Sequence, residues 1–394
     1  MPVNPQQLHE AMQRIGRSVI AAQESARAAR ATALQLLRTA ASAPDLVRAS
    51  VKEAAAEDPR IRCAVPLQEK LDATLDCPAR MEVPPILAVD GSQIDADRHQ
   101  EIQFALINTA AVTIFPGSGK TPSIVADTRL IFGDELFTAA DRPMSEGDLA
   151  LERDLAERAS LLKNSAGFQS LVALGDGPLE LWGAKDAADP RAFQKALQDY
   201  LADLRELQAR GILLAGYIDK PAADPVIRML ALHEIKSGGA QGGHPAGLRG
   251  TSDRLLFGSI LAPGQRSAIF GLQSASALRY TGDLALHFFY VNVGHAAQSA
   301  VARIEIPGWV ARDAGRVDVL HRAVLDQCAL LGDRPYPYVL HRAHESALIS
   351  AAEREQIKLR LLLEMRDHGI EPEHVSGKSY AKSLRPGPRR HRHD

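Results

Sequence analysis

The sequence predicts an α/β protein with a mixed sheet flanked by helices, preceded by a helical extension. Short runs rich in Val, Ile, Leu and Ala indicate buried strands, and two of these runs end in an Asp-Gly pair. Between residues 143 and 221 strands alternate with helical segments, which favours parallel neighbours in the sheet. With 394 residues and 45% hydrophobic content, the chain can bury a substantial core.

Composition narrows the class of protein. A net charge of -2 argues against a generally basic nucleic-acid coat, although a local basic groove remains compatible with it. The three cysteines, Cys63, Cys77 and Cys328, show no CxxC spacing, which favours a reducing compartment and no zinc site. No apolar run approaches the ~20 residues that span a bilayer. The N-terminus is polar where a signal peptide would be apolar. We therefore expect a cytoplasmic protein without a membrane segment.

The first region, residues 1–82, is predicted to be helical and to end in a linker. Residues 5–57 are rich in Ala, Gln, Arg and Glu, with a break at Pro44 because a proline keeps the preceding Ala43 out of the helical region. The helices are amphipathic, so we expect them to pack on the main domain, a second copy or another protein. Residues 58–85 contain five prolines, which indicates a linker or irregular cover.

The main domain, residues 83–370, begins with a strand over residues 86–89 that leads into Asp90-Gly91-Ser92. Gly91 is expected to mark the turn out of the sheet. An aspartate at the end of a core strand is poorly solvated unless a positive partner meets it, and a divalent metal ion is one such partner. The alternative is that Asp90 simply caps a turn.

Two more strands are predicted over residues 102–115 and 123–132. The segment between them, residues 116–121, ends in Gly119-Lys120-Thr121 and so resembles a phosphate-binding loop. That loop requires a glycine where Ile114 stands, and a helix rather than a strand should follow. We therefore predict a hairpin turn.

A helix follows over residues 143–164, with Ser145 as N-cap and Asp148 three residues on. Its apolar stripe consists of Leu151, Leu155, Ala159 and Leu162. Glu152 lies on or beside this stripe, whereas Glu157 falls on the far side. A carboxylate beside a core-facing stripe needs a partner, unless Glu152 is a solvated edge residue.

The second Asp-Gly pair follows the apolar run at residues 171–174 and contains Asp176. A helix over residues 189–210 and a strand over residues 212–221 come next, and Asp219 and Lys220 end that strand. Sites in such sheets gather at the carboxyl ends of strands. If the strands before Asp90 and Asp176 are neighbours, the two carboxylates meet.

The remainder predicts a Gly-rich flexible loop over residues 237–250, strands over 284–293 and 301–307, and helices over 314–331 and 337–368. His344 lies two turns into the last helix, where a satisfied core histidine is the alternative to a functional role. The tail, residues 371–394, carries arginines and histidines among prolines. It is expected to be disordered, with contact to nucleic acid as its candidate role.

Together these residues indicate a divalent-metal phosphodiesterase. Chain-distant acids and a histidine supply oxygen ligands that suit Mg²⁺ or Mn²⁺, and the imidazole favours Mn²⁺. Two such ions can activate a water and stabilise the leaving oxygen during in-line attack on phosphorus. The RNase H-like architecture supplies this arrangement on a mixed sheet.

The ordered motifs resemble those of the NurA nucleases. They are Asp90-Gly91-Ser92, Asp176-Gly177-Pro178-Leu179, and a segment in which Tyr336-Pro337 precedes Leu340, Ala343, His344 and Ala347. The resemblance spans about residues 83–350, and the Tyr-Pro…Ala-His segment is its most specific part. It implies an RNase H-like fold, Mn²⁺-dependent endonuclease and 5′-to-3′ exonuclease activity, and a homodimer that works in DNA end resection with a hexameric HerA-type ATPase.

The resemblance also implies residue roles. Asp90 and Asp176 would be metal ligands, His344 a further ligand or proton-transfer group, and Tyr336 would position the substrate or a metal-bound water. The family has a glutamate on the helix before the second Asp-Gly, for which Glu152 and Glu157 both remain candidates. Lys220 is a candidate for contacting the scissile phosphate.

Two other functions remain open at this stage. One is a NurA-like adaptor that binds a HerA-type ATPase without cutting, although such a protein has no need for buried unpaired acids. The other is an RNase H-like enzyme that acts on RNA or an RNA–DNA hybrid, because recognition of the 2′-hydroxyl cannot be inferred from this sequence.

Overall fold

The computed structural model describes residues 4–78, 81–97, 102–139, 141–182, 190–238, 247–295 and 298–369. The helices are α1 (Pro5–Ala41), α2 (Pro44–Glu57), α3 (Glu146–Asn164), α4 (Pro190–Ala209), α5 (Pro225–Lys236), α6 (Asp253–Phe257), α7 (Gly308–Ala311), α8 (Ala314–Ala329), α9 (Tyr338–Ala347) and α10 (Ala351–Asp367). The strands are β1 (Cys63–Pro66), β2 (Thr74–Leu75), β3 (Ile86–Ile94), β4 (Phe104–Ile114), β5 (Ser123–Phe132), β6 (Val172–Asp176), β7 (Leu213–Ile218), β8 (Arg266–Ser267), β9 (Phe270–Gln273), β10 (Leu286–Asn292) and β11 (Val301–Pro307). Most of the predicted Gly-rich loop and the whole predicted basic tail lie outside the described residues.

One mixed sheet organises the chain. Its strand order is β1-β9-β10-β11-β7-β6-β3-β4-β5, with β2 and β8 attached off this path. β3 and β6 are parallel, as are β6 and β7, whereas β4 pairs antiparallel with both β3 and β5. The part of the sheet with the order β5-β4-β3-β6-β7 is the RNase H-like mixed sheet that the sequence predicted. Parallel pairing of β3 with β6 places the two Asp-Gly strands side by side.

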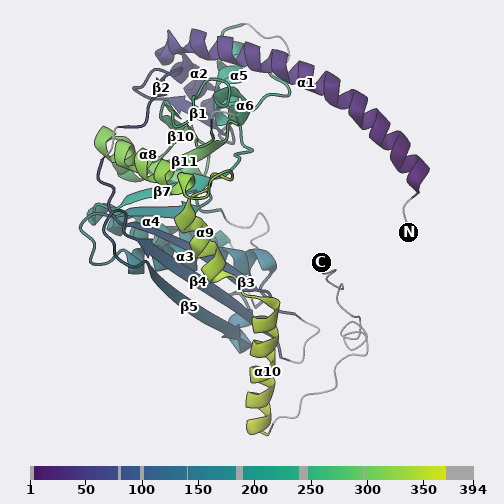
Figure 1. The fold of residues 1–394 in the computed structure, drawn as a ribbon, viewed down its shortest axis with the longest axis vertical. Coiled ribbons are helices and arrows are strands. Elements are labelled where there is room, and N and C mark those ends of the chain that lie inside the picture. The colour runs from purple at the N-terminus through teal and green to yellow at the C-terminus, as the bar shows by residue number, and fades with distance from the viewer. Residues whose placement is uncertain are drawn as a thin grey trace.

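Helices cover both faces of this sheet. α3 packs on β3 and β4 and contacts α4, while α9 packs on β3, β4 and β6 and contacts α8 (Figure 1). Alternate residues of a strand point to opposite faces. The Gly91 Cα faces α3, and the flanking Ser92 side chain bonds to α9. The main hydrophobic core therefore has two helical layers around β3, β6 and β7.

The N-terminal region packs on the far end of the same sheet. The buried side of α1 near Ala33 and Leu37 joins α2, α5, β1 and β10 in a second core. The first part of α1 projects beyond the rest of the chain, with Met12 and Ile15 exposed (Figure 1). The prediction of helices broken at Pro44 is confirmed. None of the described helices is long and apolar enough to cross a membrane.

Three predicted boundaries were wrong. Residues 58–85 contain β1 and β2, so this segment joins the sheet instead of forming a plain linker. β3 does not end at Gly91, because its pairing with β4 continues to Ile94 opposite Leu106. The predicted last helix is two helices, because Leu348 leaves the helical conformation with ψ at 131° and Ser350 begins α10 with a capping box.

The hairpin prediction is confirmed. β4 and β5 pair antiparallel, and Gly117 and Gly119 adopt positive φ angles in the turn between them. A phosphate-binding loop would lead into a helix, whereas here Lys120 and Thr121 lead directly into β5.

Candidate active site

Asp90 and His344 form the first contact of the site. Asp90 lies within β3 and His344 on α9, and the Asp90 Oδ2 atom is 2.7 Å from His344 Nδ1. The His344 side chain is 57% exposed and that of Asp90 14% exposed. His344 is therefore a surface imidazole directed at a half-buried carboxylate, and the core-histidine alternative does not hold.

The turn of α9 that carries His344 is anchored to the sheet. Ser92 Oγ and Asn108 Nδ2 both donate to the carbonyl oxygen of Ala347, three residues after the histidine. At the start of the helix, the Val339 N–H donates to Gln327 Oε1 over 3.0 Å. Anchors at both ends fix the position of His344 over Asp90.

Asp176 ends β6 and belongs to the same site. It lies next to Asp90 in the sheet, because Val89 pairs with Gly175 in the parallel ladder. Desolvation raises the pKa of Asp176 although the residue is open to solvent at the strand end; a hydrogen bond from Tyr336 opposes this rise, and the charge of Asp90 adds to it. The neighbouring carboxylate of Asp90 therefore disfavours the charged form of Asp176.

Tyr336 lies next to Asp176 and packs on Tyr217. Its ring lies edge-on to that of buried Tyr217, with centroids 5.4 Å apart. Burial and the negative charge of Asp176 raise the pKa of the Tyr336 hydroxyl, so it stays a neutral hydrogen-bond donor. The sequence named Tyr336 only by resemblance, and the structure places its hydroxyl at Asp176.

Glu157 supplies the third carboxylate. It lies on α3, and its Oε1 atom would be only 2.6 Å from a Cβ placed on Gly91. Burial raises the pKa of Glu157 to about 8, with the charges of Asp154 and Asp90 adding to the rise and Arg153 opposing it. We call Asp90, Glu157 and Asp176, together with His344 and Tyr336, the acidic centre.

The geometry of the sheet explains how acids from two faces meet. Pairing between β3 and β6 ends at Val89 and Gly175, while β3 continues alongside β4. Beyond this point the strands separate, so Glu157 approaches from the α3 face and Asp90 from the α9 face. The charge of Asp90 reaches Glu157 there and adds to the rise in the pKa of Glu157 that burial causes.

Two candidate residues lie outside the acidic centre. Glu152 pairs with Arg129 of β5, with Oε2 and Nη1 3.2 Å apart. Lys220 follows β7, where its Nζ lies 3.6 Å from Asp219 Oδ2 and its side chain is largely exposed. Asp219 is close enough to raise the pKa of Asp176, so Lys220 stands at the border of the centre.

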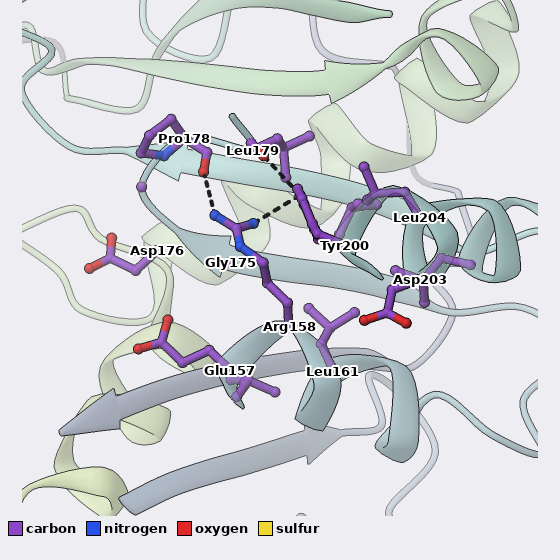
Figure 2. Close-up of a pocket in the computed structure, with 14 residues that line it drawn as sticks. Glu157, Arg158, Leu161, Gly175, Asp176, Pro178, Leu179, Tyr200, Asp203 and Leu204 are labelled. Atoms are coloured by element: carbon purple, nitrogen blue, oxygen red, sulfur yellow. Dashed lines mark hydrogen bonds between the residues drawn. The ribbon is translucent and has the colours of Figure 1, made fainter. Parts of the chain in front are cut away.

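A clamp fixes the turn that follows Asp176. Arg158, next to Glu157 on α3, donates to Tyr200 Oη over 2.9 Å and to the Pro178 carbonyl over 3.4 Å (Figure 2). Tyr200 in turn donates to the Leu179 carbonyl over 2.8 Å. Asp176 and Glu157 point to the same side of this pocket in Figure 2, away from the clamp. Nothing in the sequence marked Arg158 or Tyr200, because neither belongs to a recognisable motif.

The donor set suits a divalent cation, although it is not a preformed cage. Among the described residues, no three His, Cys, Asp or Glu side chains are grouped closely enough to hold a metal ion. Asp90 and Asp176 instead engage His344 and Tyr336. Arg153 pairs with Glu157 over 3.3 Å, yet the charge of Asp90 still adds to the raised pKa values of Glu157 and Asp176. Carboxylate oxygens with an imidazole are ligands for Mg²⁺ or Mn²⁺.

The sequence model of the NurA domain matches residues 84–349. The chain belongs to the NurA family. The match covers the whole of the sheet from β3 onward and every residue of the acidic centre, and the predicted resemblance is thereby confirmed. NurA proteins are nucleases, so the acidic centre is the candidate active site of a NurA family nuclease.

Solved structures give weaker similarities to this NurA chain. The NurA nuclease from Sulfolobus solfataricus is 13% identical with a TM-score of 0.49, over 78% of this chain and 92% of that one. The catalytic domain of human Endonuclease V is 15% identical with a TM-score of 0.30, over 71% and 84%. Drosophila Piwi is 12% identical with a TM-score of 0.30, over 68% and 30%. Among curated proteins, none matches the chain significantly.

Proposed function

We propose that this NurA chain is a divalent-metal-dependent DNA nuclease with 5′-to-3′ exonuclease and single-strand endonuclease activity. The observation that carries the proposal is the meeting of Asp90, Glu157 and Asp176 where β3 and β6 separate. Asp90 and Glu157 are mostly buried, and Asp176 lies beside Asp90 at the strand end. Placing these negative charges side by side is unfavourable without a cation, and a protein that needs only the fold has no use for it. Membership of the NurA family supports the assignment of this cluster to nuclease chemistry.

Asp90, Asp176 and His344 would hold the cation, with Mn²⁺ favoured over Mg²⁺ because of the imidazole. A bound divalent cation would supply Lewis acidity at the phosphodiester and lower the pKa of water. The chain contributes the placement of the ligands. Ser92 and Asn108 fix the helix that carries His344, and Arg158 fixes the turn after Asp176.

Glu157 and Tyr336 would act on protons. A carboxyl group with a pKa of about 8 can gain or lose a proton near neutral pH, which suits a general base facing the attacking water. The Tyr336 hydroxyl remains protonated, so it can donate a hydrogen bond to Asp176 or to a phosphate oxygen. Glu152, held by Arg129, is the less suitable catalytic glutamate.

We propose further that the protein works in DNA end resection with a HerA-type ATPase, as a homodimer in the cytoplasm. The support for this is family membership together with the described helices, none of which could cross a membrane. α1 offers an extended surface outside the matched residues 84–349 on which a partner could assemble.

The test is cleavage of end-labelled single- and double-stranded DNA in Mn²⁺, Mg²⁺ or EDTA, comparing wild type with Asp176→Ala. Asp199→Ala is the matched control, since it removes an exposed carboxylate of α4. We expect cutting that requires the metal, survives in Asp199→Ala and is lost in Asp176→Ala.

Absence of cutting by the folded wild-type protein in every metal would contradict the proposal and favour the adaptor. In that case HerA-type ATPase binding would be measured next. Cutting of RNA or an RNA–DNA hybrid in preference to DNA would reassign the substrate to the RNase H-like alternative.

A further inference from the structure

A large cleft borders the acidic centre on the side of β7. Its volume is about 690 Å³, and Tyr336, Asp219 and Lys220 form the wall nearest the acids. The pocket between Glu157, Asp176 and α4, by contrast, measures about 40 Å³, enough for a water molecule or two. Of these two spaces, the larger cleft is the one with room for a substrate strand beside the acids.

The cleft is built from chain segments that are distant in sequence. α1, the end of β7, α6, the β10–β11 turn and residues 333–336 each contribute to its lining. The walls are held by specific contacts. His295 Nε2 lies 2.8 Å from the carbonyl oxygen of Gly332, which ties the β10–β11 turn to the segment before α9. Gly294 packs so tightly that a Cβ there would be 2.2 Å from the Gln298 carbonyl oxygen.

The charges of the cleft are predominantly positive. Arg30, Lys220, Arg254 and Arg334 line it, against only Asp219 and Asp333, so its formal charge is +2 with His295 neutral. In the described part of the chain, the guanidinium groups of Arg30, Arg254 and Arg334 have no carboxylate partner within salt-bridge distance. We call this surface the basic cleft.

The basic cleft is unusual in a chain whose net charge is -2. Three unpaired arginines beside an acidic centre provide attraction for an anion at a place where the acids alone would repel it. Lys220 adds a cation held in a strained backbone conformation, with φ at 46°. Lys220 stands between the acids and the arginines, and backbone strain of this kind is typical of residues held in place for ligand binding.

We propose that the basic cleft binds the phosphates of a single DNA strand on one side of the scissile phosphodiester. This inference rests on the proposed nuclease function and extends it to the path of the substrate. Grooves that hold single strands place cations along the backbone, as Arg30, Arg254 and Arg334 would. The strand runs from these arginines past Lys220 and Tyr336 into the acidic centre.

The size of the cleft supports one strand over two. A volume of about 690 Å³ lies within the range of pockets that enclose small ligands. The major groove of a DNA duplex is alone about 12 Å wide. A duplex would therefore have to separate at its end before one strand reached the acids.

The test measures binding in EDTA, so it does not depend on catalysis. Fluorescence anisotropy with labelled oligothymidylate gives the Kd of the full chain over a series of salt concentrations. The triple variant Arg30→Gln/Arg254→Gln/Arg334→Gln removes the three unpaired cations, and Arg205→Gln, on the exposed surface of α4, is the control for general charge. Thermal melting of each variant checks that it is folded.

We expect the triple variant to bind the oligonucleotide at least about tenfold more weakly than the wild type. The slope of log K against log salt concentration should also be shallower by about 2, because each lost phosphate contact contributes ~0.7 to the slope for a single strand. Arg205→Gln should leave both quantities unchanged. An unchanged salt slope in the folded triple variant would overturn the assignment, as would an equal loss in Arg205→Gln. Tighter binding of oligouridylate or a blunt duplex that depends on the same arginines would overturn the choice of single-stranded DNA. Wild-type binding without cleavage in any metal would instead defeat the proposed function and leave the cleft assignment standing.

Discussion

Gly91 offers the sharpest single perturbation of the acidic centre. A Cβ at this position would lie 2.6 Å from Glu157 Oε1 and 3.0 Å from the Cγ atoms of Glu157 and Arg153. Ordinary contacts of a Cβ begin at about 3.4 Å, so Gly91→Ala must move the Glu157 carboxylate by about 0.8 Å. The backbone of Gly91 has a negative φ, and alanine can adopt it without strain.

The expected effect of Gly91→Ala is on catalysis more than on stability. The clashing atoms belong to flexible side chains, and replacing a strand glycine contributes about 0.4–1 kcal/mol of stability by restricting the unfolded chain. The free energy of unfolding should therefore change by less than about 1 kcal/mol. A displacement of about 1 Å in a catalytic group can lower the rate about 100-fold, so we expect a 10- to 100-fold loss of cleavage.

Gly175→Ala is the matched control. It adds the same methyl group one residue before Asp176, and a Cβ there meets no atom within 4 Å. Single-turnover cleavage of labelled single-stranded DNA in Mn²⁺ should separate the two variants. A wild-type rate in Gly91→Ala, or an equal loss in both variants, would refute the placement of Glu157 in the site.

Three further predictions concern the same residues. Glu157→Gln should abolish cleavage while Glu152→Gln retains it, and wild-type rates in both variants in the same assay would remove α3 from the site. Tyr336→Phe should lower kcat at least about tenfold with a melting temperature close to that of the wild type, because it removes only the hydroxyl at Asp176; an unchanged kcat would make Tyr336 a packing residue. In EDTA, the free energy of unfolding should fall as pH rises from about 4.5 to about 8, because folded Glu157 keeps a proton that the unfolded chain has lost. The fall amounts to at most about 5 kcal/mol, and urea unfolding should show that Glu157→Gln flattens it; a slope that persists in this variant would assign it to another group.

The strands that carry the site could be predicted because each one is marked by a pattern within its own short stretch of sequence. Continuous apolar runs before Asp90 and Asp176 indicate strands buried on both faces. The helix after Asp176 favours parallel pairing of β6 with β7, whereas the pairing of β3 with β6 remained conditional in the sequence. The capping box at Ser145 and the break at Pro44 were equally local, and both are confirmed. Such features depend on residues within one turn or one strand.

Other features depend on contacts that sequence does not encode locally. The apolar stripe of α3 seemed to place Glu152 inward, but the row that faces the sheet contains Leu149 and Leu161, and Glu157 lies in that row at fourfold spacing. The glycine of the first Asp-Gly pair was interpreted as a turn. It stands within β3, because β4 continues to pair beyond it.

The Asp90-Gly91-Ser92 motif has a physical basis that its composition does not reveal. Successive residues of a strand face opposite sides, so three neighbours can serve two helical layers. Asp90 holds His344, and Ser92 anchors the same helix through the Ala347 carbonyl. Gly91 faces the other layer, where the absence of a side chain lets Glu157 approach. A turn would need a glycine for its backbone freedom, whereas β3 needs Gly91 because a side chain there would displace Glu157. This need for space explains why a motif of turn-forming residues lies within a strand at the centre of the site.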